Sequence, residues 1–143
     1  MELTLRDKVV VITGPAKGMG QAISMAFATE GAHLVLAGRD LSAIEPVAAM
    51  TRSQGVQALV CSCDLTIAEQ TRALTESALN YFGRIDVLVN VAGGSGPVGK
   101  TGWDTTEEEF RQIVDINMTG CFNTMSAVLP SMISQKSGKV VNV

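Results

Sequence analysis

Residues 13–20, Thr-Gly-Pro-Ala-Lys-Gly-Met-Gly, decide the fold of this chain because of their immediate neighbours. The residues before them, 8–13 (KVVVIT), are almost all apolar or β-branched, which predicts a strand buried on both faces. The residues after them, 21–30, predict a helix that ends at Gly31. A strand, a glycine-rich loop and a helix in this order open a doubly wound sheet.

The three glycines of this loop have separate predicted tasks. Gly14 permits a tight turn, Gly18 lets the backbone approach a ligand without a Cβ, and Gly20 lets the helix pack closely on the strand. The N-terminus of the helix then directs free N–H groups at an anion. We therefore predict that the loop binds the pyrophosphate of a dinucleotide. A turn that is glycine-rich by coincidence is the alternative.

The rest of the chain repeats the alternation of strand and helix. Alternating elements pair their strands in parallel through right-handed crossovers. The predicted fold class is α/β, a doubly wound parallel Rossmann sheet of strand order 3-2-1-4-5, forming one domain over residues 1–143. The last predicted strand reaches the end of the sequence without a turn, so we expect a domain truncated after its fifth strand. The further strands are predicted at 33–37, 56–61, 86–90 and 139–143, and the further helices at 41–54, 67–82 and 106–135.

Composition narrows the classes of protein. Of 143 residues, 46% are hydrophobic and 17% charged, which suits a folded core rather than a disordered chain. A net charge of −3 argues against a nucleic-acid partner. The sequence has no apolar run of signal or membrane-span length. Its three cysteines have no metal-ligand spacing, so we expect no metal site and a reducing, cytoplasmic location.

Several motifs, in order, resemble those of the short-chain dehydrogenase/reductase family of the non-extended type. The loop spacing Thr-Gly-x-x-x-Gly-x-Gly is similar to that of the family. Residues 90–93, Asn-Val-Ala-Gly, are similar to its Asn-Asn-Ala-Gly, with Val91 in place of the second Asn. Asn117 stands in a segment similar to the family's active-site Asn segment, and residues 138–143 resemble the strand that leads to its catalytic Ser.

The resemblance implies an NAD(P)-dependent oxidoreductase that transfers a hydride between a nicotinamide cofactor and an alcohol or ketone. It implies that Asp64, after the third predicted strand, bonds the adenine, and that Asn117 is a catalytic residue that holds a water of a proton relay. It also implies a homodimer or homotetramer. The cofactor-binding residues expected from the loop and the resemblance are Gly14, Lys17, Gly18, Met19, Gly20, Arg39, Asp64, Leu65, Asn90, Ala92 and Gly93.

The family's catalytic Tyr-x-x-x-Lys is missing from these 143 residues, whose one tyrosine is Tyr81 within a predicted helix. A tyrosine with its ordinary pKa of about 10 needs a neighbouring lysine to act at neutral pH. The sequence also ends before the Ser. We therefore expect this stretch alone to hold the cofactor without transferring hydride. The alternative is a catalytically silent dinucleotide-binding or sensing protein.

The end of the second predicted strand bears on the choice of cofactor. NAD enzymes place an Asp or Glu there for the ribose 2′-hydroxyl, but aligned to the family this position holds Gly38. Arg39 follows, and Lys17 lies within the loop, so two cations suit a 2′-phosphate. NADP is favoured over NAD. Two alternatives remain open: Arg39 stacks on adenine or is solvated, or Asp40 reaches the ribose.

The predicted helix 106–135 begins with a capping box, Thr106 with Glu109, and breaks local rules near its middle. Asn117 falls on an otherwise apolar stripe, where we expect a buried amide with partners. Because Thr119 and Gly120 are poor helix formers, we predict a functional or distorted turn there. A satisfied core Asn is the alternative. Trp103, before this helix, either contacts substrate or anchors its loop against the helix.

Overall fold

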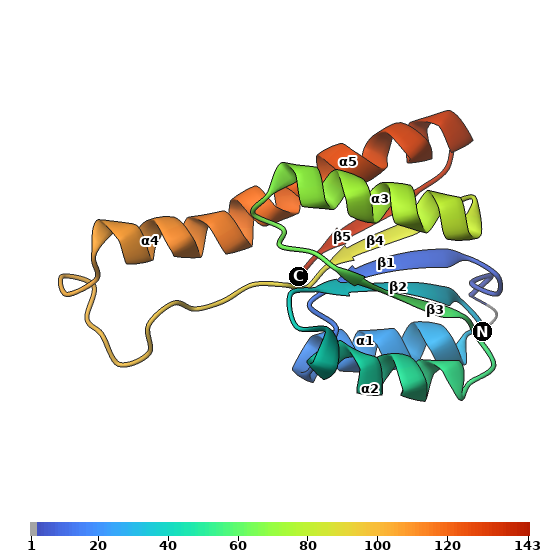
Figure 1. Cartoon of the computed structure of the whole chain (residues 1–143), viewed down its shortest axis with the longest axis horizontal. Helices are drawn as coiled ribbons and strands as arrows, with labels where there is room; N and C mark the ends of the chain where they lie inside the picture. Colours follow the sequence, from blue (N-terminus) through green and yellow to red (C-terminus); the bar gives the residue numbers. More distant parts are fainter. Residues whose placement is uncertain (1–2) are drawn as a thin grey trace.

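The computed structural model describes residues 3–143 as a parallel five-stranded sheet between two layers of helices (Figure 1). The strand order β3-β2-β1-β4-β5 confirms the predicted topology. Helices α1 and α2 cover one face of the sheet, and α3 and α5 cover the other. The elements are β1 Val9–Thr13, α1 Gly18–Thr29, β2 His33–Gly38, α2 Leu41–Arg52, β3 Ala58–Ser62, α3 Ala68–Phe82, β4 Val87–Asn90, α4 Glu107–Val114, the π-helical turn η1 Asp115–Thr119, α5 Gly120–Gln135 and β5 Lys139–Asn142.

The central strand β1 explains why the sheet is buried on both faces. All five of its residues are buried, and it pairs in parallel with β2 on one side and β4 on the other. Because side chains alternate across a strand, Val10 and Ile12 enter the core under α1 and α2, whereas Val9 and Val11 enter the core under α3 and α5. The unbroken apolar run of β1 therefore serves two cores, as predicted.

Two boundaries differ from the sequence-based prediction for physical reasons. Helix α1 begins at Gly18 rather than at residue 21, because its glycines lie in the first turn, where tight packing counts for more than helix propensity. Strand β3 spans Ala58–Ser62 rather than 56–61, because its pairing with β2 begins at Ala58 opposite Leu34. The other predicted strands and helices shift by two residues or fewer, apart from the long helix.

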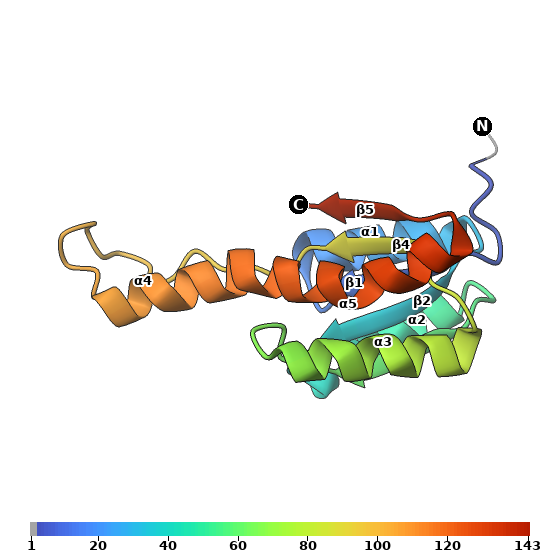
Figure 2. The same cartoon turned by 90° about the horizontal axis from the view of Figure 1, so that it is seen from above.

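The predicted helix 106–135 is three elements rather than one. Helix α4 ends at Val114, the π-helical turn η1 covers Asp115–Thr119, and α5 continues from Gly120. The distorted turn predicted around Asn117 is therefore confirmed. Residues 93–106 and α4 extend beyond the sheet as an arm, visible in both Figure 1 and Figure 2. None of the eight described residues of α4 is buried.

The amino-terminal edge of the sheet is held by a buried carboxylate. Asp86 accepts a hydrogen bond from the Val9 N–H at 2.9 Å and two from the Arg84 guanidinium, at 2.8 and 2.6 Å. Burial raises the pKa of Asp86, but Arg84, the Val9 N–H and Lys8 outweigh it and hold the pKa below its ordinary value. The loops after β1, β2, β3 and β4 lie at the opposite, carboxyl-terminal edge of the sheet.

Three further observations concern residues 3–143. The capping box of Thr106 and Glu109 is present in both directions, as predicted. All three cysteines are free thiols. Within the described range, every helix is too short or too polar to cross a membrane.

Candidate binding site at the carboxyl edge of the sheet

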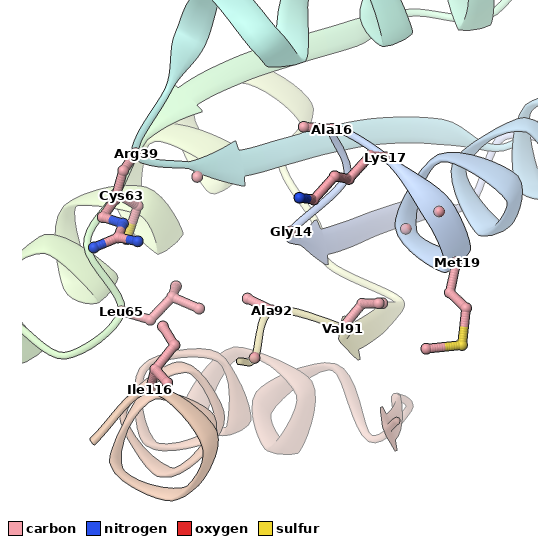
Figure 3. A pocket seen from close by; sticks show the side chains of 14 residues that line it. Gly14, Ala16, Lys17, Met19, Arg39, Cys63, Leu65, Val91, Ala92 and Ile116 are labelled. Atoms are coloured by element: carbon pink, nitrogen blue, oxygen red, sulfur yellow. The ribbon is translucent and has the colours of Figure 1, made fainter. Parts of the chain in front are cut away.

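A cavity of about 470 Å³ opens where β1, β2 and β4 end (Figure 3). It lies at the point where the strand order reverses, between β1 and β4, the usual place for a ligand in a doubly wound sheet. The structure brings nine of the predicted cofactor residues together around it: Gly14, Lys17, Gly18, Met19, Gly20, Arg39, Leu65, Ala92 and Gly93. Ala16, Gly38, Cys63, Val91 and Ile116 complete the lining.

Thr13 opens the crevice between β1 and β4. Its hydroxyl oxygen accepts hydrogen bonds from the backbone N–H groups of Val91 and Ala92, at 3.1 and 3.2 Å. A side chain thus satisfies donors that the sheet no longer pairs. The next residue, Gly14, has a φ of +67° and lies against Ala92, whose Cα would be 2.8 Å from a Cβ at that position. Only glycine fits this turn.

The loop from Gly14 to Gly20 is a cradle of backbone that side chains would fill. A Cβ on Gly20 would lie 2.0 Å from the Gly14 carbonyl oxygen, so glycine is needed for α1 to begin this close to β1. Gly18 is different: its φ is +55°, and a Cβ there would meet no described atom within 4 Å. Helix α1 begins without a side-chain cap from Lys17, so its first N–H groups remain for a ligand. These features fit a bound pyrophosphate.

The end of β2 carries an exposed cation, Arg39, and a carboxylate, Asp40, that caps the next helix. Asp40 caps α2, because its Oδ1 accepts from the Ser42 hydroxyl at 2.6 Å, the Ser42 N–H at 3.0 Å and the Ala43 N–H at 3.2 Å. The Ser42 hydroxyl, more than any other group, lowers the pKa of Asp40. Arg39 is exposed and lines the cavity, and Figure 3 shows Lys17 extending from the glycine loop toward the same side.

Gly38 also lines this end of the cavity. A Cβ there would lie 3.0 Å from Ile44 Cδ1, so a side chain would require Ile44 to give way slightly. Because Gly38 has no side chain, Arg39 is the charged residue at the end of β2 that lines the cavity.

Two predicted residues lie outside the main cavity. Asp64 lines a second cavity of about 390 Å³, which adjoins the first because Arg39, Gly93 and Ile116 line both. Asn90 is buried beneath the site, where its Oδ1 accepts from the Thr124 hydroxyl at 2.8 Å and its Nδ2 donates to Asn142 Oδ1 at 2.9 Å. Asn90 therefore joins β4 to α5 and β5.

Asn117 is exposed, so the expectation of a buried amide is wrong. The apolar stripe predicted for residues 106–135 is buried only where the helix packs on the sheet. Val128 and Met132 are buried there, whereas Phe110, which lies in the arm, is exposed. The Asn117 amide is nevertheless fully bonded. Its Oδ1 accepts from the Gly94 N–H at 3.2 Å, and its Nδ2 donates to the carbonyls of Gly94 and Ile113, both at 2.8 Å. Asn117 thus holds the turn that borders the cavity.

Sequence reasoning missed Cys63 and Ile116 as lining residues. Cys63 follows β3 directly, so its position after a parallel strand was a usable signal. Burial raises the pKa of Cys63 to about 11, which keeps it a neutral thiol. Ile116 gave no signal, because it reaches the cavity only through the π-helical turn.

Trp103 is 86% exposed, so it does not anchor the loop against the helix.

Comparison with known proteins identifies the family. The family model described as short chain dehydrogenase matches residues 8–143. An uncharacterized oxidoreductase of Listeria monocytogenes is 34% identical over 141 residues, which are 97% of this chain and 55% of that protein. The chain therefore spans about half the length of the curated relatives it matches.

Solved structures agree. A 7α-hydroxysteroid dehydrogenase complexed with NADH and 7-oxo glycochenodeoxycholic acid has a TM-score of 0.92 and 32% identity, with 99% of this chain and 55% of that chain covered. A metagenomic short-chain oxidoreductase in complex with NADP has a TM-score of 0.90 and 31% identity, with 96% and 62% covered.

Proposed function

This chain belongs to the short-chain dehydrogenase family, and from that premise we propose that it binds NADP in preference to NAD and serves hydride transfer to or from an alcohol or ketone. The observation that carries the proposal is the cavity that joins the glycine loop to Arg39. A bound nicotinamide would supply the hydride donor or acceptor, and the residues of this chain would hold and orient it.

The glycine loop is proposed to bind the pyrophosphate. Support comes from the start of α1, which lines the cavity and has no side-chain cap from Lys17, and from the open space beside Gly18. An anion there gains both the N–H hydrogen bonds and the favourable end of the helix dipole. Met19 and Gly20, at the start of α1, line the same wall.

Preference for NADP is proposed from the charges at the end of β2. Arg39 and Lys17 supply two cations to the cavity, and Gly38 brings no carboxylate that would repel a 2′-phosphate. Asp40 is committed to capping α2, which disfavours the alternative in which it accepts from the ribose hydroxyl. Asp64 and Leu65 are proposed to border the adenine, and Asn90, Ala92 and Gly93 to support the ribose and nicotinamide side.

Asn117 is proposed as a positioning residue. Its amide fixes both backbone groups of Gly94, next to cavity-lining Gly93. The family resemblance adds that the helix turn around it holds a water of a proton relay. The π-helical turn η1, which changes the backbone hydrogen bonding at this place, supports a special role for the segment.

Binding titrations test the cofactor proposal. NADPH and NADH would be titrated into the protein, its Arg39→Ala variant and an Arg72→Ala control, which removes an exposed cation from α3. We expect NADPH to bind more tightly than NADH and Arg39→Ala to lose about 10-fold of that preference, as for one charge-assisted contact. Arg72→Ala should keep it. An unchanged preference in Arg39→Ala would refute the phosphate assignment.

A catalytically silent dinucleotide-binding protein is the second candidate. It is favoured by the position of Tyr81, which is 57% exposed on α3 and packs edge-on against Phe82 instead of lining the cavity. The two candidates separate in an assay of reduced nicotinamide absorbance with a panel of small alcohols and ketones. Turnover would support the oxidoreductase, and tight binding without turnover would support the silent protein.

Self-association is proposed through α5. Phe122, Leu129 and Ile133 lie on one side of this helix at spacings of seven and four residues and are 63%, 39% and 72% exposed. A homodimer or homotetramer would cover them. A cytoplasmic, reducing location is proposed from the three free cysteines. Sedimentation of the protein and of a Phe122→Ser variant would test the association, which the variant should weaken.

A further inference from the structure

Arg39 lies on the wall between two adjoining cavities. One is the main cavity beside the glycine loop, and the other is lined by Asp64 and Thr66 after β3 and by residues of the arm and η1. Arg39 therefore borders the proposed phosphate site and also lines the cavity that Asp64 lines. A cation in this position attracts both the carboxylate of Asp64 and an anion in the main cavity.

Asp64 is held as a fixed negative charge. Its Oδ1 accepts from the Thr66 hydroxyl at 2.7 Å and the Thr66 N–H at 3.0 Å, and its own N–H donates to Gln70 Oε1 at 2.7 Å. Thr66, with a smaller contribution from Arg39, lowers the pKa of the carboxyl, so Asp64 is ionised at neutral pH. The side chain is half-buried and cannot turn away without losing these bonds.

We propose that Asp64 limits how strongly this protein prefers NADP over NAD, by competing with the 2′-phosphate for Arg39. The inference rests on the proposed function and adds a specificity-determining residue to it. A 2′-phosphate would be repelled by Asp64 and attracted by Arg39, whereas the 2′-hydroxyl of NAD carries no charge to sense either. Contacts between Asp64 and adenine are common to both cofactors and cancel in the ratio of their affinities.

Two other carboxylates, Glu109 and Asp115, line the second cavity, and Glu109 provides the control. Glu109 is bonded to Lys100 at 2.6 Å and to the Thr106 N–H at 2.8 Å, and Asp115 accepts from the Thr119 hydroxyl at 3.2 Å. Glu109 belongs to the arm and already has a lysine partner. Glu109→Gln therefore removes one negative charge from the same cavity, and glutamine still serves in a capping box.

A double-mutant cycle on the protein tests the proposal. Dissociation constants for NADPH and NADH would be measured for the protein, Asp64→Asn, Arg39→Ala and the double variant, with Glu109→Gln as control. Asp64→Asn should raise the NADPH-to-NADH affinity ratio by about two- to fivefold, as expected for partly solvated charges. In the Arg39→Ala background, Asp64→Asn should raise the affinity ratio by a smaller factor. High salt should also reduce the rise that Asp64→Asn causes. Glu109→Gln should leave the ratio unchanged.

The outcomes separate the inference from the proposed function. Equal loss of both cofactors in Asp64→Asn, with no change of ratio, would overturn the inference while leaving the Arg39 assignment intact. An Arg39→Ala variant with an unchanged ratio would instead overturn the proposed phosphate site. If Asp64→Asn does not fold, Asp64→Ser retains an acceptor for the Thr66 N–H and should raise the ratio in the same direction; an unchanged ratio would overturn the inference.

Discussion

Gly18→Ala tests the proposed pyrophosphate cradle most directly, because its control lies in the same chain. Gly18 and Gly55 both have left-handed backbone, with φ of +55° and +86°, and a Cβ on either meets no described atom within 4 Å. Of these two glycines, Gly18 lines the main cavity and Gly55 does not. Alanine at either position carries a left-handed conformational cost, which is larger at Gly55 because its φ lies beyond the allowed left-handed range of about +50° to +70°. A loss of ligand binding in Gly18→Ala alone therefore reports the cavity.

The stability cost follows from the backbone alone. A left-handed alanine costs about 1–2 kcal/mol, and the stiffer unfolded chain recovers about 0.4–1 kcal/mol. Gly18→Ala should thus lose about 1 kcal/mol of unfolding free energy, and Gly55→Ala should lose more, because its φ of +86° lies outside the allowed left-handed region. At Gly18 the new methyl group would also separate the backbone from the pyrophosphate. Losing one hydrogen bond to a charged group costs about 1.5–3 kcal/mol, which lowers dinucleotide affinity by about 10- to 100-fold.

Urea unfolding and NADPH fluorescence titration would measure the two effects separately. We expect a lower unfolding midpoint in both variants, with the larger shift in Gly55→Ala, but a loss of NADPH affinity in Gly18→Ala alone. NADH affinity should fall by the same factor, because both cofactors share the pyrophosphate. If Gly18→Ala binds NADPH as tightly as Gly55→Ala, the glycine loop does not contact the phosphates and the proposed orientation of the cofactor is wrong.

Three further predictions concern stability. Asp86→Asn should lower the unfolding free energy by about 1–3 kcal/mol at neutral pH. Because the folded pKa of Asp86 lies below the ordinary 3.8, its carboxylate stabilises the fold above pH 3.8, and this stabilisation is lost as the pH falls through the folded pKa. The urea midpoints of the variant and the unmodified protein should therefore converge in acid. A constant difference at all pH values would contradict this. Asn117→Ala should lose about 1 kcal/mol and speed hydrogen exchange of the Gly94 amide, whereas unchanged exchange would show that the amide bonds do not order the turn. Thr106→Ala should lose about 0.5–2 kcal/mol of helix stability, seen as faster exchange at the start of α4 alone; faster exchange throughout the sheet would show that the arm and the core unfold together.

Local patterns were sufficient for the sheet and the glycine loop. The continuous apolar run of β1 predicts burial on both faces, and the alternation of elements predicts the order 3-2-1-4-5; both are confirmed. Two of the loop glycines were interpretable because a Cβ at Gly14 or Gly20 would collide with neighbouring backbone. Nine of the predicted cofactor residues line one cavity because the carboxyl ends of parallel strands meet at one edge of the sheet.

Features that depend on distant contacts were not predictable. The periodicity of 106–135 indicated an amphipathic helix, but it could not show that the helix projects past the sheet, so Asn117 was expected to be buried. The role of Asn90 was also hidden, because its partners Thr124 and Asn142 come from other elements. Asp40 could be read as a ribose ligand or a helix cap, and only the Ser42 and Ala43 bonds identify it as a cap.

The arm has a consequence for how this protein can change over evolutionary time. Because none of the eight described residues of α4 is buried, substitutions on it cost the core little, and insertions in residues 93–106 lengthen a surface loop at small entropic expense. Its base, however, is fixed by Asn117 on Gly94, next to the cavity. Variation in the arm can therefore change the surface beside the second cavity while the glycine loop and the sheet stay constant.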